Sequence, residues 1–300
     1  MRYKIWALFF WIGAASCFGL DHLQEMSLEE KVGQILMVHF HGEVSNEEAR
    51  ILIQDVKVGG IIYYNWANGL HSPEQVRALS ADLQQLAKGN HIPIPLLIAV
   101  DQEGGRVARL QSGFTRFSGN QALGDTGDPS LAEMAAFAMG QELRAVGINM
   151  NLAPVVDVNS NPKNLVIGTR SFGNHPEIVI AFGAKFLDGL KRVPVVATLK
   201  HFPGYGDVDV DPHADLPVIR KSKEELERIE LLPFKQLAPF ADAIMTAHIL
   251  VPALDPDLCS TLSKNTLDYL RHVIGFQGVI VTDSLVMDGV LKQCHSVDEA

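Results

Sequence analysis

Short apolar runs alternate along the chain with longer segments in which apolar residues recur at helical spacing. Seven of these runs are typical of buried strands, and they lie near residues 35–40, 61–64, 95–100, 148–156, 195–199, 243–247 and 278–282. Strands that are separated by helices indicate a parallel sheet with right-handed crossovers. The hydrophobic pattern therefore predicts an α/β protein.

Residues that favour helix N-termini stand before the helical segments. The spacing of a capping box, a Ser followed three residues later by a Glu, occurs at Ser27 and Glu30, Ser45 and Glu48, and Ser222 and Glu225. Further helices are expected to begin at Ser72-Pro73, Asp128-Pro129 and Pro176. These starts divide the chain into regular strand and helix units.

Two folds fit such units, an open doubly wound sheet and a closed barrel. The open sheet predicts a Gly-rich phosphate-binding turn after an early strand, and no G-x-G-x-x-G stands at such a position. The barrel predicts reactive side chains at the carboxyl ends of many strands. That pattern is present at Asp101, Asp157, Lys200 with His201, His248 and Asp283. We therefore predict a (β/α)8 TIM-type barrel.

The predicted barrel lacks its last strand and helix. Only seven strand-like runs precede Ala300, and residues 295–300 resemble the start of a helix. The alternatives are a chain that stops early and a barrel that is open between its last and first strands. Because an uncovered parallel edge strand is a liability, we expect that the chain as given stops early.

Composition limits the possible partners. The chain has 300 residues, enough for one large barrel or two ordinary domains. With 47% hydrophobic and 20% charged residues it can bury a sizeable core. The formal net charge of -10 argues against nucleic acid or an anionic membrane surface as a partner.

The N-terminus has the features of a secretory signal. Arg2 and Lys4 precede an uncharged apolar stretch over residues 5–20, which ends near small residues. The stretch is close to the length of about 20 residues that spans a bilayer, so an uncleaved anchor is the alternative. We predict a signal peptide or anchor over 1–20 and one barrel domain over 21–300.

The cysteines bear on location and on metal binding. Ala14-Ala15-Ser16-Cys17 resembles a degraded bacterial lipobox, so lipidation of Cys17 is a second possibility for attachment. We expect an exported protein, periplasmic or at the cell envelope, whose contact with a membrane is limited to this N-terminal segment. Cys259 and Cys294 form no ligand-spaced cluster, which excludes a cysteine-based zinc site.

An acidic loop follows the predicted strand at 195–199. The strand leads into Lys200 and His201, and the Pro- and Gly-rich residues after it include Asp207, Asp209, Asp211, His213 and Asp215. The loop has three interpretations: a solvated surface loop, a metal site, or a pair in which Asp211 fixes the tautomer of His213 and raises its pKa. The loop by itself does not decide between them.

Four segments carry a resemblance when they are taken in order. They are AVDQEGGRV at 99–107, IGTRSF at 167–172, KHFPG at 200–204 with Asp211 and His213 after it, and VTDSL at 281–285. From about Leu28 onward the chain resembles glycoside hydrolase family 3, in particular its single-domain bacterial β-N-acetylhexosaminidases.

The resemblance implies a role for each matching residue. Asp283 matches the nucleophile that forms a covalent glycosyl-enzyme, and His213, held by Asp211, matches the acid/base. The positions that bind the terminal N-acetylglucosamine correspond to Asp101, Arg109, Arg170, Lys200 and His201. No metal or cofactor is implied. Cations around Asp283 are expected to keep its carboxylate charged, as a retaining mechanism requires.

The implied function is a retaining exo-glycosidase. It would remove terminal β-linked N-acetylglucosamine from peptidoglycan-type or chitin-type fragments, and its partner would be a small carbohydrate. Two features depart from the family pattern: Tyr205 replaces the residues that are common there, and Pro212 stands where Ser or Thr is usual. Pro212 restricts the residue before it, so closure of the loop is expected to differ.

Three alternatives stay open. A family 3 β-glucosidase commonly has Asp-Trp at the nucleophile and a second domain, whereas Ser284 follows Asp283 here. A metal-dependent amidohydrolase would use His201, His248 and Asp283, but the expected His-x-His after the first strand is absent. A non-catalytic sugar-binding barrel is suggested by the missing last strand.

Overall fold

The computed structural model describes residues 22–208, 216–294 and 296–300. The predicted signal or anchor over 1–20, including Cys17, lies outside these residues, and so do Asp211 and His213. Among the described residues, no helix has both the length and the apolar character needed to cross a membrane.

One parallel sheet forms the centre of the molecule, and all seven predicted strands are present in it. Its order is β1 (Met37–Val38), β2 (Gly60–Tyr63), β3 (Leu97–Val100), β6 (Met150–Asn151), β7 (Val196–Phe202), β8 (Ala243–Thr246) and β9 (Val279–Thr282). Every neighbouring pair is parallel. The chain thus adds strands in sequence order, as successive right-handed strand–helix–strand units do.

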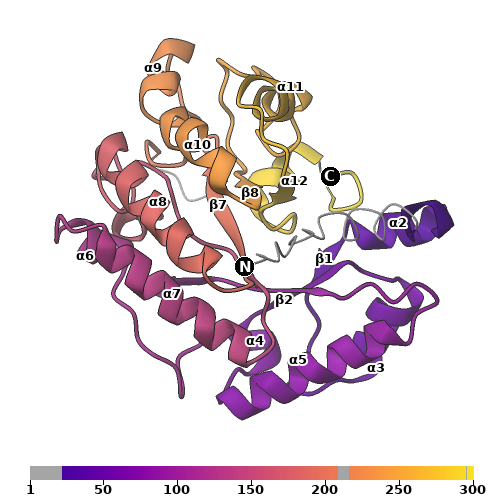
Figure 1. The fold of residues 1–300 in the computed structure, drawn as a ribbon. Helices are drawn as coiled ribbons and strands as arrows, with labels where there is room; N and C mark the ends of the chain where they lie inside the picture. Colours follow the sequence, from indigo (N-terminus) through magenta and orange to yellow (C-terminus); the bar gives the residue numbers. More distant parts are fainter. Residues whose placement is uncertain (1–21, 209–215, 295) are drawn as a thin grey trace, which may run out of the picture.

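Helices surround the outside of the curled sheet (Figure 1). They are α2 (Leu28–Gln34), α3 (Glu47–Arg50), α4 (Asn65–Asn68), α5 (Pro73–Lys88), α6 (Asn120–Gly124), α7 (Ser130–Ala145), α8 (Pro176–Lys191), α9 (Lys223–Arg228), α10 (Leu231–Leu237), α11 (Lys264–Asp268) and α12 (Asp288–Cys294). Short 3-10 turns, η2 (Gly168–Arg170) and η3 (Ala238–Phe240), and π-helical turns, η1 (Ile51–Asp55) and η4 (Tyr269–Val273), complete the connections.

The two faces of the sheet have different packing. In β2, the buried side chains of Ile61 and Tyr63 belong to the large cluster that joins sheet and helices. The side chain between them, Ile62, packs instead with Ala99 and Met150 in a second cluster. Alternate residues of a strand point to opposite faces, so the second cluster fills the concave side of the curled sheet.

The helix starts follow the sequence closely, with one exception. Both predicted capping boxes at Ser27 and Ser222 are present. The prediction at Ser45 is wrong, because Asn46 caps α3 and its side chain accepts a hydrogen bond from the Ala49 amide. Glu48 is used elsewhere, as its carboxylate accepts from the His41 amide. A competing cap one residue later therefore displaced the predicted one.

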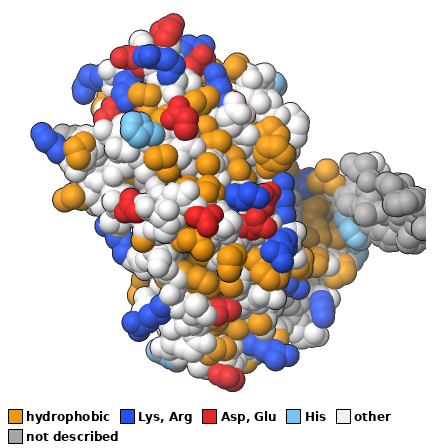
Figure 2. Space-filling model, turned by 60° about the vertical axis from the view of Figure 1, so that its left-hand side comes forward, with side chains coloured by type: hydrophobic (Ala, Val, Ile, Leu, Met, Phe, Trp, Pro, Cys, Tyr) orange, Lys and Arg blue, Asp and Glu red, His pale blue; other side chains and the backbone are white. Residues whose placement is uncertain are grey.

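The sheet is an incomplete TIM-type barrel, as predicted. β1 and β9 form its two edges, and no strand joins them in the described parts of the chain. Figure 2 shows that basic and acidic side chains are interspersed on the face in view, without a broad field of either sign.

Candidate active site

A short hairpin carries two acidic side chains and an arginine to the end of β3. Asp101 follows β3, and β4 (Gln102–Gly104) pairs with β5 (Val107–Ala108) just before Arg109. Gly104 has φ +90°, and a Cβ there would lie 2.7 Å from the Ser118 carbonyl oxygen. Only glycine tolerates that conformation and that close approach, so the Gly-Gly pair of the motif is required for the turn.

Lys200 holds the two acidic side chains together. Its Nζ lies 2.8 Å from Asp101 Oδ1 and 2.7 Å from Glu103 Oε1. Lys200 and His201 lie within β7 rather than beyond its end, and the Lys200 side chain is only 2% exposed. A buried ammonium group is tolerated here because two carboxylates compensate its charge.

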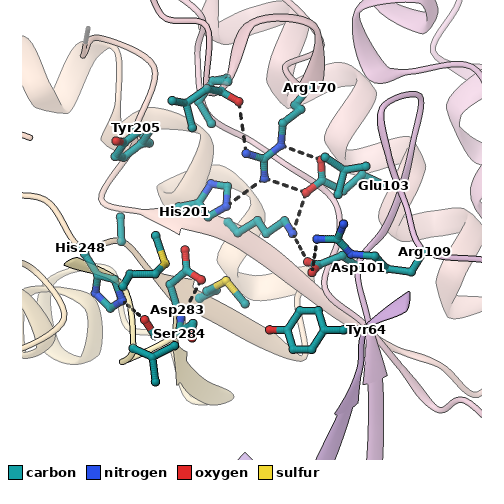
Figure 3. A pocket seen from close by; sticks show the side chains of 18 of the residues that line it. Tyr64, Asp101, Glu103, Arg109, Arg170, His201, Tyr205, His248, Asp283 and Ser284 are labelled. Carbon is teal, nitrogen blue, oxygen red and sulfur yellow. Dashed lines mark hydrogen bonds and ion pairs between the residues drawn. The ribbon is translucent and has the colours of Figure 1, made fainter. Parts of the chain in front are cut away.

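Arg170 extends the charged cluster from η2. Its Nε and Nη2 donate to the two oxygens of Glu103 over 2.9 and 2.8 Å, a bidentate pairing (Figure 3). Arg109 contacts the other carboxylate, with Nη2 3.4 Å from Asp101 Oδ2. Three cations therefore contact two carboxylates, and both oxygens of Glu103 are paired with Lys200 or Arg170.

The ionisation of this cluster follows from its pairing. Burial alone would raise the pKa of Glu103, but the charges of Lys200 and Arg170 outweigh it and lower that pKa to about 2. Burial and Lys200 oppose each other in the same way at Asp101, whose pKa is also lowered. Burial would lower the pKa of Lys200, yet the two carboxylates raise it. All three groups are charged near neutral pH.

His201 is held by a carboxylate that is completely buried. Its Nδ1 lies 2.7 Å from Asp157 Oδ2, while the other oxygen of Asp157 accepts from the His201 and Tyr205 amides. Arg170 Nη2 approaches His201 Nε2 to 3.2 Å. Because a guanidinium only donates, Nε2 must accept and Nδ1 must carry the proton. Asp157 thus fixes the tautomer and orientation of the ring.

The opposite side of the site comes from β8 and β9. Asp283 follows β9, and its Oδ1 accepts from the Ser284 amide over 2.7 Å. His248 follows β8, with Nδ1 3.0 Å from the Thr261 hydroxyl and Nε2 2.9 Å from the Ser284 carbonyl oxygen. A carbonyl oxygen only accepts, so Nε2 donates and holds the segment that carries Asp283.

These elements enclose one pocket of about 520 Å³. The six predicted site residues in the described chain all line it: Asp101, Arg109, Arg170, Lys200, His201 and Asp283. Their labelled members face a common space, and Tyr64 lies below Asp101 in Figure 3. Burial, together with the charges of Asp101 and Asp283, raises the pKa of Tyr64 to about 12, so its phenol is neutral. The six residues therefore share one pocket, and their roles stay predictions.

The predicted surroundings of Asp283 differ from those in the structure. The cations expected around Asp283 make their ion pairs with Asp101 and Glu103, and none within 4.0 Å joins a cation to Asp283 in the described residues. Asp211 and His213 lie outside those residues, so their pairing stays a prediction. The amidohydrolase alternative needs a group of three or more His, Cys, Asp or Glu that could hold a metal. The described part of the chain contains no such group.

Glu103 and Asp157 were not predicted as site residues. Glu103 stands two residues after Asp101, and alternate residues of an extended segment share a face, which is the signal that could have found it. Asp157 was recognised as a polar residue near a strand end but received no role. Their partners, Arg170 and His201, are more than 40 residues away in sequence, and no local pattern reveals such pairs.

The fold and the pocket define an α/β protein of the TIM-barrel type with a polar pocket at the carboxyl ends of its strands. Comparison with known proteins identifies the family within this class. Residues 27–300 match the glycosyl hydrolase family 3 N terminal domain. The chain belongs to this family.

Its relatives include two curated proteins. It is 40% identical to beta-hexosaminidase A of Pseudoalteromonas piscicida, with 82% of this chain and 44% of that protein covered. It is 36% identical to a beta-hexosaminidase of Pseudomonas aeruginosa, with 88% and 76% covered. The chain therefore spans less than half of the first relative and about three quarters of the second.

Solved structures agree with this assignment. A family 3 beta-N-acetylglucosaminidase from Paenibacillus sp. str. FPU-7 is 48% identical with a TM-score of 0.86, over 89% of this chain and 51% of that chain. NagZ from Neisseria gonorrhoeae, solved in complex with N-trifluoroacetyl-D-glucosamine, is 32% identical with a TM-score of 0.78, over 89% and 78%.

Proposed function

We propose that the chain is the barrel of a retaining, exo-acting β-N-acetylhexosaminidase. It would remove terminal β-linked N-acetylglucosamine from chitin-type or peptidoglycan-type fragments. The observation that carries the proposal is that Asp283 shares one pocket with the fixed cluster of Asp101, Lys200 and Arg109. Relatives named beta-hexosaminidase support the sugar that we assign to it.

The charged cluster suits the hydroxyl groups of one terminal sugar. The ionised carboxylate of Asp101 is an acceptor, and Arg109 and Lys200 are donors. The Nε of Arg109 is buried and has no hydrogen-bond partner among the described residues. A buried donor without a partner costs free energy, so the position of this side chain is not set by full hydrogen bonding.

The same pocket has an apolar side. Met245, Ala247, Val286 and Met287 line it on the side of β8 and β9. These side chains offer a surface for the methyl group of an N-acetyl substituent, whereas a glucoside would leave that surface unused. Discrimination by one methyl-sized group is worth about 1–3 kcal/mol, so preference rather than exclusion is expected.

The chemistry would proceed in two displacements. The Asp283 carboxylate attacks the anomeric carbon as the glycosidic bond breaks, and the leaving oxygen takes a proton from the acid/base that we assign to His213. Neutral His213 then removes a proton from water, which attacks the anomeric carbon and releases Asp283. Asp211 would orient the imidazole in both steps.

Covalent trapping tests the assignment of the nucleophile. We would incubate the full chain with a fluorinated N-acetylglucosamine-type inactivator and identify the labelled peptide by mass spectrometry. We expect one label on Asp283 and none in the Asp283→Asn variant. A label on another residue would overturn the proposed site. Faster release of nitrophenol from the glucoside than from the N-acetylglucosaminide would favour the β-glucosidase alternative.

Leaving-group dependence tests the acid/base. The His213→Ala variant should hydrolyse substrates with poor leaving groups about 10²–10⁴-fold more slowly, because they need a proton to depart. An activated aryl glycoside should lose less, since its phenolate departs without one. Comparing kcat/KM on the two substrates measures this difference, and an equal loss on both would count against His213.

A further inference from the structure

One large aromatic side chain stands exposed at the edge of the pocket. Trp66 lies on α4, directly after β2, and lines the same pocket as Asp283 although its side chain is 65% exposed. It is the only tryptophan of the described residues. An exposed aromatic ring at the edge of a pocket offers an apolar face to a ligand that enters the pocket.

The indole of Trp66 is held by neighbouring rings. It stacks on Tyr64, with centroids 5.2 Å apart and planes at 18°, and meets His39 edge-on at 4.9 Å. Burial and the nearby His41 lower the pKa of His39, which favours the neutral form of its ring near neutral pH. A neutral, pre-positioned aromatic surface suits the apolar face of a pyranose ring better than it suits an anion.

The backbone beneath Trp66 is fixed as well. The side chain of Asn68 accepts from the Tyr64 amide over 3.1 Å and donates to the Phe40 carbonyl oxygen over 3.1 Å. Asn65 donates to the Arg109 carbonyl oxygen, which ties α4 to the hairpin of the charged cluster. We call the indole ring of Trp66 the platform. An aromatic ring fixed in this way loses little conformational entropy when a ligand binds.

Tyr64 connects the platform to the chemistry. Its ring lies under the Arg109 guanidinium at 5.9 Å, and the charges of Asp101 and Asp283 act on its hydroxyl. Trp66 stacks on the same Tyr64 ring and lines the same pocket. Tyr64 therefore contacts both Arg109 and Trp66, so the indole lies beside the groups assigned to the terminal sugar rather than among them.

We propose that Trp66 is a binding site for the second sugar of the substrate, the one on the leaving-group side of the cleaved bond. This inference rests on the proposed function, because that function places the terminal sugar beside Asp101 and Asp283. The ligand class is a β-linked disaccharide of N-acetylated pyranoses. A single platform implies that recognition extends one sugar beyond the bond that breaks.

Binding to an inactive variant of the whole 300-residue chain tests the platform. In Asp283→Asn, calorimetry would give Kd for N-acetylglucosamine, for N,N′-diacetylchitobiose and for N-acetylglucosaminyl-N-acetylmuramic acid. We expect a disaccharide to have a lower Kd than the monosaccharide, and the ratio of the two Kd values is the disaccharide's advantage. We expect Trp66→Ala to reduce that advantage by about tenfold. The disaccharide that shows the advantage identifies the source, chitin-type or peptidoglycan-type.

Two further variants control the comparison. Trp66→Phe should retain most of the advantage, because an aromatic face remains. Phe240→Ala removes another exposed ring, 53% exposed and not part of the pocket, and should leave the advantage unchanged. If neither disaccharide binds better than the monosaccharide, or if Trp66→Ala weakens all three sugars equally, the platform is overturned.

Turnover by the unmodified chain separates this proposal from the proposed function. Trp66-dependent disaccharide binding without cleavage would support the platform and count against the glycosidase. Cleavage of diacetylchitobiose with a kcat/KM that Trp66→Ala changes no more than Phe240→Ala does would support the glycosidase and overturn the platform.

Discussion

The two sides of the pocket are built in different ways. On the side of β3 and β7, Lys200, Glu103 and Arg170 are bound into a nearly buried network of ion pairs. On the side of β8 and β9, Asp283 accepts a hydrogen bond from the Ser284 amide, and His248 bonds to the Thr261 hydroxyl and the Ser284 carbonyl oxygen. The first side keeps charges in fixed positions, whereas the second leaves a carboxylate without a competing cation in the described chain.

This difference suits the two tasks that the proposed glycosidase function requires. Recognition of a sugar requires donors and acceptors that do not rearrange, and buried charge pairs provide them. Nucleophilic attack requires a carboxylate whose lone pairs are available, and an ion pair would stabilise it before reaction. We therefore expect substitutions on the first side to affect stability and binding together, and substitutions at Asp283 to affect catalysis alone.

The largest effect is expected at Asp283. Asp283→Asn removes the nucleophile that we propose, so kcat should fall by about 10⁴-fold or more. The Asn side-chain oxygen can still accept from the Ser284 amide, so the free energy of unfolding should change by less than about 0.5 kcal/mol. Steady-state kinetics and urea unfolding measure the two quantities. A large loss of stability would show that the two sides are not separate.

The next effect is expected at Lys200. Lys200→Met leaves Asp101 and Glu103 buried beside each other without their shared cation, which should cost about 3–5 kcal/mol of unfolding free energy. Lys185→Met is the matched control, because Lys185 also pairs with two carboxylates but its side chain is 44% exposed. It should cost less than about 1 kcal/mol. Similar losses in both variants would contradict the distinction between buried and surface pairs.

The sequence predicted most of this architecture because its signals are local. Alternating apolar runs located all seven strands, and the position of Asp101, Lys200 and Asp283 after or within those runs predicted that they meet. Parallel strands in sequence order bring their carboxyl ends to one side, so the position of each residue along its strand is enough.

The sequence did not reveal the ion pairs between residues that are far apart along the chain. Which carboxylate pairs with Lys200 depends on side-chain packing across β3 and β7. Only the folded structure shows that Glu103, and not Asp283, pairs with Lys200 and Arg170. The cap of α3 was missed for another reason, because Asn46 and Ser45 are both good caps and residue type does not choose between them.

Acid should weaken the charged side specifically. The folded pKa of Glu103, about 2, lies below its usual value of 4.5, so its contribution to stability is complete above pH 4.5 and is lost as the pH falls toward 2. Protonation over this window should remove about 3 kcal/mol or less. Unfolding curves between pH 6 and pH 2 measure it. Glu103→Gln, which cannot titrate, should show a smaller slope, and an equal slope would exclude Glu103 as the source.

Within the charged side, the smallest loss of stability is expected at Arg109, which lies at the border of that side. Its side chain is 34% exposed and its contact with Asp101 is long, at 3.4 Å, so Arg109→Gln should cost less than about 1 kcal/mol of unfolding free energy. Binding should suffer more, because a charged donor to the sugar is lost and KM should rise about tenfold while kcat changes little. Arg170→Gln is the comparison, since Arg170 is 14% exposed and bidentate on Glu103, and its loss should reduce stability as well. If Arg109→Gln lowers kcat and stability as much as Arg170→Gln does, Arg109 is part of the buried network rather than a binding residue at its edge.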